Sequence, residues 1–154
     1  MNEHDDKRRF RDAIGNFATG VCVVTAFTEA GRPTGMTANA ITSLSLDPLL
    51  MIVCFDNSAR TLEAAKVQRR VGVNVLAVGQ EDVSKVFASK ASEDEKFAGV
   101  GWSEHGGVPV LDGCVSWFSG SLGELVPGGD HQIGIVAVED FEAPGGEPLL
   151  YFRG

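Results

Sequence analysis

Residues 35–48 read GMTANAITSLSLDP, and this stretch decides the fold because it combines the pattern of a strand with small and hydroxylated side chains. We expect an extended chain from Thr34 to Leu46, in which alternate side chains share a face. One face then carries Met36, Ala38 and Leu44, and the other face is polar and carries Thr37, Asn39, Ser43 and Ser45. Side chains this small leave the backbone open to a ligand, so the polar face is a candidate binding surface.

The next residues predict a strand, a turn and a helix in direct succession. Leu49–Phe55 is a continuous apolar run, which is typical of a strand buried on both faces. Ser58–Gln68 is expected to form a helix, with Ser58 as its N-cap and Thr61 in its first turn. Free backbone N–H groups at a helix N-terminus attract anions, and Arg60 adds positive charge there. The sequence therefore places a candidate anion site at this helix, although an ordinary capped helix without a ligand explains the same residues.

The whole chain predicts a single, mainly β domain over residues 1–154, with short helices and a flexible N-terminus over residues 1–9. Phe10, Ile14 and Phe17 mark one face of an opening helix that should cover one end of a barrel. Residue patterns predict strands at 21–27, 71–76, 115–126, 133–141 and 149–152, and helices at 81–88 and 92–97. Periodicity alone does not choose between a sandwich and a barrel.

Composition limits the classes of partner. With 154 residues and 44% hydrophobic content, the chain is large enough to bury a core without disulfides or metals. Its 21 acidic residues against 13 Lys and Arg give a net charge of -8, which argues against binding nucleic acid or an anionic membrane. No apolar stretch reaches the roughly 18 to 20 residues of a membrane span, and no signal-like segment follows the charged N-terminus. We therefore expect a cytoplasmic protein whose partners are small molecules and proteins.

The cysteines and histidines predict no metal site. Cys22, Cys54 and Cys114 are odd in number and too far apart for a CxxC motif, so we expect reduced thiols. Cys22 and Cys114 are expected to be small buried residues. His4 lies in a charged terminus and His105 in a glycine-rich loop, without the spacing of metal ligands.

Several short motifs occur in the order typical of one known family. Besides the segment 35–61, they are FATGV at 17–21, VVT at 23–25, KFAG at 96–99, GDH at 129–131 and PLLY at 148–151. From about Phe10 to its last residue, the chain resembles the short-chain flavin reductases, the reductase partners of two-component flavin monooxygenases. The resemblance implies an FMN-binding split β-barrel of Greek-key type with a few accessory helices, and a homodimer with a flavin near each subunit boundary.

The resemblance also implies which residues contact the flavin. Asn39 and nearby backbone N–H groups are expected at the isoalloxazine ring, where donors would stabilise the reduced, anionic form. The helix mouth at Ser58 is expected at the phosphate, and the backbone of Cys54–Asp56 at the ribityl chain. Phe87 is equally explained as part of an amphipathic helix, and Lys90 as a solvated charge. The full predicted set is Met36, Thr37, Ala38, Asn39, Ser43, Ser45, Cys54, Phe55, Asp56, Ser58, Arg60, Thr61, Phe87 and Lys90.

Three residues nearer the C-terminus are implied to bind the nicotinamide dinucleotide. His131 opens a strand after a glycine-rich turn and is expected beside the nicotinamide, where its imidazole binds the carboxamide or donates a proton. Asp130 either orients this imidazole or only favours the turn. Tyr151 matches a family position close to the nicotinamide, although packing also explains a lone strand aromatic. Arg153 is expected to attract the phosphates.

These expectations lead to one leading function and two alternatives. The leading hypothesis is an NAD(P)H:flavin oxidoreductase that reduces FMN or FAD and supplies the reduced flavin to a partner monooxygenase. FMN and NADH are favoured, with FAD and NADPH left open. The chain has neither G-x-G-x-x-G nor a Walker loop, so the nicotinamide nucleotide should bind in a shallow site. The alternatives are a flavin carrier without efficient nicotinamide turnover and a split barrel adapted to haem, for which no histidine is an evident axial ligand.

Overall fold

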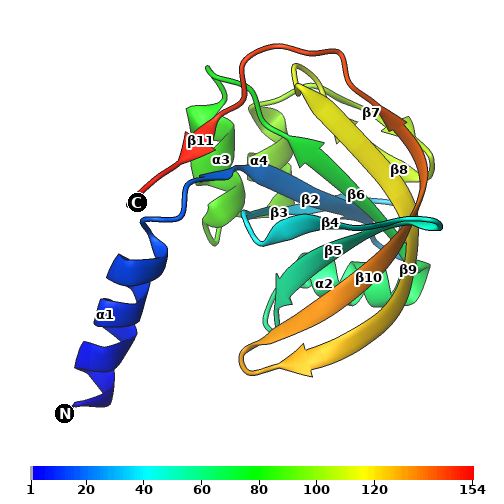
Figure 1. The fold of residues 1–154 in the computed structure, drawn as a ribbon. Helices are drawn as coiled ribbons and strands as arrows, with labels where there is room; N and C mark the ends of the chain where they lie inside the picture. Colours follow the sequence, from blue (N-terminus) through cyan, green and yellow to red (C-terminus); the bar gives the residue numbers. More distant parts are fainter. Residues whose placement is uncertain (1) are drawn as a thin grey trace.

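The structure, a computed structural model, describes residues 2–154, and this range contains four helices and eleven strands. The helices are α1 (Glu3–Ile14), α2 (Arg60–Gln68), α3 (Glu81–Ala88) and α4 (Glu93–Ala98) (Figure 1). The strands are β1 (Thr19–Gly20), β2 (Cys22–Phe27), β3 (Pro33–Ala38), β4 (Ile41–Leu46), β5 (Leu49–Asp56), β6 (Arg70–Val75), β7 (Trp102–His105), β8 (Val108–Leu111), β9 (Ser116–Gly128), β10 (His131–Glu142) and β11 (Leu150–Tyr151). None of these helices is long and apolar enough to cross a membrane.

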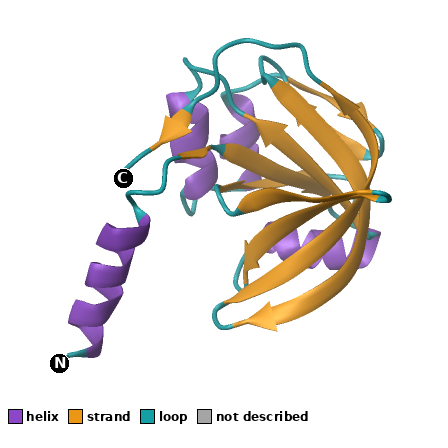
Figure 2. Ribbon diagram, viewed as in Figure 1, coloured by secondary structure: helices purple, strands orange, loops and turns teal. Residues whose placement is uncertain are grey.

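Seven strands form one antiparallel sheet in the order β3-β2-β6-β9-β10-β5-β4. Its two edges, β3 and β4, are consecutive in the chain and joined only by Asn39 and Ala40. Two residues span only a few ångströms, so the sheet must curl until its edges meet at this link, and Figure 2 shows this curvature. The predicted mainly β fold with a few short helices is confirmed, and β3 and β4 are the two edges of the sheet, which do not pair with each other.

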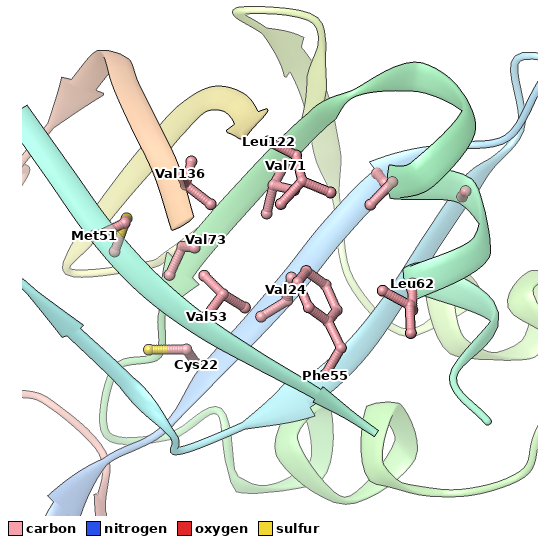
Figure 3. Close-up of a cluster of buried hydrophobic side chains, with 13 residues drawn as sticks. Cys22, Val24, Met51, Val53, Phe55, Leu62, Val71, Val73, Leu122 and Val136 are labelled. Carbon is pink, nitrogen blue, oxygen red and sulfur yellow. The ribbon is translucent and has the colours of Figure 1, made fainter. Parts of the chain in front are cut away.

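The core fills the inside of the curved sheet (Figure 3). Val24 of β2, Val53 and Phe55 of β5 and Val73 of β6 are almost completely buried there. Leu62 of α2 closes the cluster from the adjacent helix. Burial of one such aliphatic or aromatic side chain contributes about 1.5–3 kcal/mol, so this cluster is the main stabilising feature of the barrel.

β5 has one face toward this core and one face outside it. Met51, Val53 and Phe55 point inward, whereas the alternate residues Leu50, Ile52 and Cys54 are only half-buried. The prediction that this strand is buried on both faces is therefore wrong. The sequence hides the alternation because the side chains of the outer face are apolar as well.

α3 and α4 pack on β3. The rings of Phe87 and Phe97 meet edge to face with centroids 4.9 Å apart, in a cluster that includes Val23. Gly35 permits the close approach, because a Cβ atom there would lie 2.7 Å from the Phe87 ring. The helices predicted at 81–88 and 92–97 are confirmed, with Ser92 as the N-cap of α4 in a capping box.

α1 extends away from the sheet, and its own chain buries none of its residues (Figure 1). Phe10 is 69% exposed, Ile14 54% and Phe17, just beyond the helix, 71%. The prediction that this helix covers one end of its own barrel is therefore wrong, because an apolar stripe predicts a contact without saying which surface provides it. The helix begins at Glu3 and so takes in most of residues 1–9, for which the sequence predicted flexibility.

Two further elements differ from the sequence prediction. Residues 34–46 were expected to form one strand, but the chain leaves β3 after Ala38 and enters β4 at Ile41. The β7–β8 hairpin was not predicted, and its turn uses Gly106 and Gly107, both at positive φ.

Candidate functional site

A groove of about 1140 Å³ runs along the outer face of β4 and β5. Its lining is mainly apolar and includes Leu50, Ile52 and Cys54 of β5, and the Asn39–Ala40 link with the adjoining Thr42 and Ser43 is among its polar contributors. The Cys54 N–H donates a hydrogen bond to the Ala40 carbonyl, which holds the link against β5. The groove therefore has an apolar floor and a polar rim, which is the combination that suits a flat aromatic ligand.

The polar side chains of segment 34–46 do not share one face as predicted. The Thr37 hydroxyl donates to the Ser84 carbonyl of α3, on the helix-covered side of β3. Asn39 and Ser43 line the groove, while the Ser45 hydroxyl accepts the Asp47 N–H. The alternation fails because the strand is interrupted at Asn39–Ala40 and because β4 carries a register shift between Ser43 and Ser45.

Other predicted flavin residues are enclosed by protein. Phe55 lies in the core and is 0% exposed, whereas Met36 and Ala38 are partly buried against the same cluster. Thr61 is 1% exposed, and its hydroxyl is 3.1 Å from the Thr34 hydroxyl. Phe87 is also 1% exposed, which fits the packing explanation that the sequence had left open.

The turn from β5 into α2 is organised by a carboxylate. Asp56 accepts hydrogen bonds from the Ser58 hydroxyl at 2.6 Å and from the Ser58 N–H at 2.8 Å, and these bonds lower the pKa of the Asp56 carboxyl. The prediction that Ser58 is the N-cap is therefore wrong. α2 begins one residue later, with Ala59 at the N-cap position and no side-chain cap.

Arg60, the first residue of α2, is held by the connection between α3 and α4. Its Nη2 donates to the Ala91 carbonyl at 2.6 Å and lies 3.0 Å from Glu93 Oε1. Lys96 is almost completely buried beside the same carboxylate, 3.7 Å from Oε1, and loss of hydration lowers the pKa of its ammonium group despite this pairing. Lys90 is exposed in the same connection. Arg60 and Lys96 thus share one carboxylate, that of Glu93, beside the mouth of α2.

His131 continues the outer face of β5 toward α2. It lies opposite Asp56 in the register of β10 with β5, so the two side chains share a face. The His131 Nδ1 is 2.7 Å from Asp130 Oδ1, and this hydrogen bond lowers the pKa of the Asp130 carboxyl. Asp130 thereby engages one ring nitrogen, and Nε2 has no partner within residues 2–154. The structure thus gives Asp130 an imidazole contact in addition to its place in the turn.

The other two predicted nicotinamide residues line cavities that His131 does not line. Tyr151 of β11 lines the groove and pairs with Thr19 of β1. Arg153 donates from Nε and Nη2 to the Asn16 side chain and lines a separate cavity of about 350 Å³. The structure therefore does not group Arg153 with His131, and its proposed contact with the phosphates stays a prediction.

The thiols differ in their surroundings. Burial raises the pKa of the Cys22 thiol to about 11 and that of Cys114 to about 12, which confirms both as buried residues. Cys54 is half-buried in the groove, and partial burial raises its pKa as well. Within residues 2–154, no group of three or more His, Cys, Asp or Glu side chains is placed to hold a metal ion.

Sequence reasoning missed three residues of this region. Glu93 and Lys96 form the buried ion pair beside Arg60, and Leu46 is a large apolar residue at the groove that is 83% exposed. Lys96 stood in the KFAG motif, but the motif gave no sign of its burial. The position of Leu46, an apolar residue directly before the Asp47–Pro48 turn, was the available signal.

Comparisons with known proteins agree with this geometry. The family model described as "Flavin reductase like domain" matches residues 14–154. A probable flavin reductase of Rhizobium meliloti (strain 1021) is 44% identical over 150 residues, which are 97% of this chain but 48% of that protein, so this chain spans about half the length of that relative. Reductase subunit HsaB of a flavin-dependent monooxygenase from Mycobacterium tuberculosis is 36% identical, with 100% of this chain and 83% of HsaB covered. The NADH:FAD oxidoreductase SgcE6 of Streptomyces globisporus C-1027, solved with NAD and FAD fragments, superposes with a TM-score of 0.90 at 32% identity, covering 100% of this chain and 93% of SgcE6. The chain therefore belongs to the family of flavin reductase-like domains.

Proposed function

We propose that this protein is an NAD(P)H:flavin oxidoreductase that reduces FMN or FAD and supplies the reduced flavin to a partner monooxygenase. The observation that carries the proposal is the match of residues 14–154 to the flavin reductase family, together with a groove at the family's flavin-contacting segment. Relatives that are themselves named as reductase components of monooxygenases support the transfer of reduced flavin to a second enzyme.

The residues of the groove fit a flavin. Its apolar floor, formed by Ile52 and Cys54, suits one face of an aromatic ring, and the amide side chain of Asn39 lies at the rim. Arg60, at the mouth of α2, provides the positive charge that a flavin phosphate needs. We assign ring contacts to the Asn39–Ala40 link and phosphate contacts to Arg60 and the first backbone N–H groups of α2.

The protein's part in the reaction is to position two nucleotides. A bound flavin supplies the ring that accepts hydride, and a nicotinamide nucleotide supplies the hydride. His131 holds its imidazole on the outer sheet face through Asp130, with Nε2 left to bind the nicotinamide carboxamide or to hold a proton. The protein would contact only one face of the flavin ring. The other face would then stay accessible for stacking of the nicotinamide, which is the hydride donor.

We further infer that the protein acts as a homodimer. The groove is lined by apolar side chains at both ends, and Leu46, Leu49 and Phe141 around it are strongly exposed in the single chain. Monomeric proteins seldom expose so many large apolar residues in one region, which supports burial of this surface by a second copy. Residues 10–17, with their exposed Phe and Ile side chains, would contribute to the same contact.

Steady-state oxidation of NADH and NADPH, each with FMN and with FAD, tests the proposed activity. We expect flavin-dependent oxidation for at least one of the four pairs, and the relative rates will show which flavin and which nicotinamide nucleotide the protein uses. Protein that binds flavin but oxidises neither nucleotide would instead be a flavin carrier. His131→Ala is expected to raise the KM for the nicotinamide nucleotide, with Val67→Ala on α2 as a control variant outside the groove.

A further inference from the structure

Glu93 connects three elements around the proposed flavin phosphate site. Its Oε2 accepts the backbone N–H of Gly35 in the edge strand β3 at 3.0 Å. Its Oε1 lies 3.0 Å from Arg60 Nη2 in α2 and 3.7 Å from Lys96 Nζ in α4. Lys96 in turn donates to the Gly35 carbonyl at 3.1 Å. The N–H and the C=O of one β3 residue are therefore both bound by side chains of α4.

This arrangement makes the Glu93 carboxylate rigid. The Lys96 side chain is 5% exposed and that of Glu93 19% exposed, so Glu93 cannot turn into solvent without leaving the Lys96 charge buried and unpaired, which is costly. Oε1 is buried and receives no hydrogen bond of good geometry, so its contacts with both cations are ionic. Glu93 therefore contributes a fixed negative charge beside Arg60.

Arg60 is held through only one of its nitrogens. Both its hydrogen bond to the Ala91 carbonyl and its ionic contact with Glu93 use Nη2. Within residues 2–154, no group bonds its Nη1 or its Nε, and the side chain is 53% exposed. The guanidinium plane is thus fixed at one end, while donors at the other end remain for an anion.

We propose that Glu93 is a positioning residue for phosphate recognition: it holds Arg60 through Nη2 so that the remaining guanidinium donors face the flavin phosphate. The proposal rests on the proposed flavin site, because it assigns the phosphate to Arg60. Glu93 does not touch the ligand in this arrangement. An ion pair that neutralised Arg60 completely would weaken anion binding, but Lys96 shares the carboxylate, so the three side chains keep one net positive charge.

The test compares FMN with riboflavin, which has the same ring and ribityl chain but no phosphate. Dissociation constants for both are measured by the change in flavin fluorescence on binding. Glu93→Gln keeps an oxygen for the Gly35 N–H but removes the charge that holds Arg60. We expect it to weaken FMN binding about fivefold, as loss of one charge-assisted contact would, and to leave riboflavin binding unchanged.

Two variants on the same helix serve as controls. Asp94→Asn removes the exposed Arg32–Asp94 ion pair one residue away and should change neither constant. Phe97→Leu shortens a buried side chain of α4 and leaves all three charges in place, so it should lower the melting temperature without changing the ratio of the FMN dissociation constant to the riboflavin dissociation constant. A rise of this ratio in Phe97→Leu equal to that in Glu93→Gln would mean that loss of stability explains the effect, which would overturn the positioning role.

The Arg60→Gln background separates action through Arg60 from other effects. If Glu93 acts by holding Arg60, the double variant Arg60→Gln with Glu93→Gln should bind FMN with the same affinity as Arg60→Gln alone. A further fivefold loss in the double variant, or an unchanged FMN-to-riboflavin ratio in Glu93→Gln, overturns the inference while leaving flavin binding itself intact. A wild-type protein that binds neither FMN nor riboflavin would instead refute the proposed function, and the positioning role with it.

Discussion

Thr61 was predicted at the phosphate site from its sequence position, but its burial gives it a structural role. Its position in the first turn of α2 suits contact with a phosphate, yet its hydroxyl is buried and shares a hydrogen bond with the Thr34 hydroxyl of β3. A hydroxyl enclosed in this way contributes to stability by satisfying its partner, because a buried polar group without a hydrogen bond is costly. Thr61 thus joins α2 to the sheet edge directly beneath the helix mouth.

Thr61→Val is therefore expected to affect stability rather than flavin binding. Valine has nearly the same shape but leaves the Thr34 hydroxyl buried without its partner, which should lower the free energy of unfolding by about 1–3 kcal/mol. Urea unfolding measures this loss, and the double variant Thr34→Val with Thr61→Val should recover part of it because no polar group is then left unpaired. FMN affinity should stay at the wild-type value. Weaker binding of FMN but not of riboflavin would show that Thr61 contacts the phosphate after all.

At the scale of elements, sequence patterns identified most of the strands and helices but not where they break. α3 and α4 were predictable because helical spacing and the Ser92 capping box mark them. The interruption at Asn39–Ala40 was not, since neither residue is a glycine or proline and small or β-branched residues continue on both sides of it. The start of α2 was displaced by one residue because the Asp56 carboxylate captures Ser58, a local competition that residue preferences do not resolve.

The sequence likewise predicted some residues of the candidate site and missed how others are buried. Asn39 and Cys54 lie in the groove because strand order brings them together, and the family resemblance had already grouped them. Phe87 and Thr61 face the interior, which depends on how α2 and α3 lie on the sheet rather than on local sequence. The buried position of Lys96 could not be anticipated, because a lysine between charged and apolar residues is ordinarily solvated.

Gly35 tests the packing of α3 on β3. Gly35→Ala would place a Cβ 2.7 Å from the buried Phe87 ring and 3.3 Å from Val23, so the helix or the ring must shift. Overpacking of this kind costs about 1–3 kcal/mol, and thermal unfolding should show a lower melting temperature. Gly20→Ala is the matched control, since no atom lies within 4 Å of its added Cβ. Equal losses in the two variants would contradict the close contact between α3 and β3.

At the scale of the whole molecule, the single chain leaves a large apolar surface exposed. Within residues 2–154 no residue of α1 is buried, and the groove between α1 and β5 is bounded by large apolar side chains, including Phe17, Leu46 and Phe141. Both features are explained if a second copy covers the groove, since each copy then buries what the other leaves exposed. The proposed ring site at Asn39 opens into this same groove. Association would therefore also shape the space available to the flavin ring.

Leu46→Asp is expected to prevent this association. Leu46 is 83% exposed in the single chain, so aspartate costs the isolated fold little, whereas its charge would be buried without a partner between two copies. Light scattering should give a mass of twice 16.3 kDa for the wild type and 16.3 kDa for the variant, with unchanged circular dichroism. Val67→Asp on α2, at 59% exposure and outside the groove, should remain dimeric. A monomeric wild type would contradict the dimer, and so would dissociation caused equally by both substitutions. Weaker flavin binding in monomeric Leu46→Asp would show that the ring site depends on association.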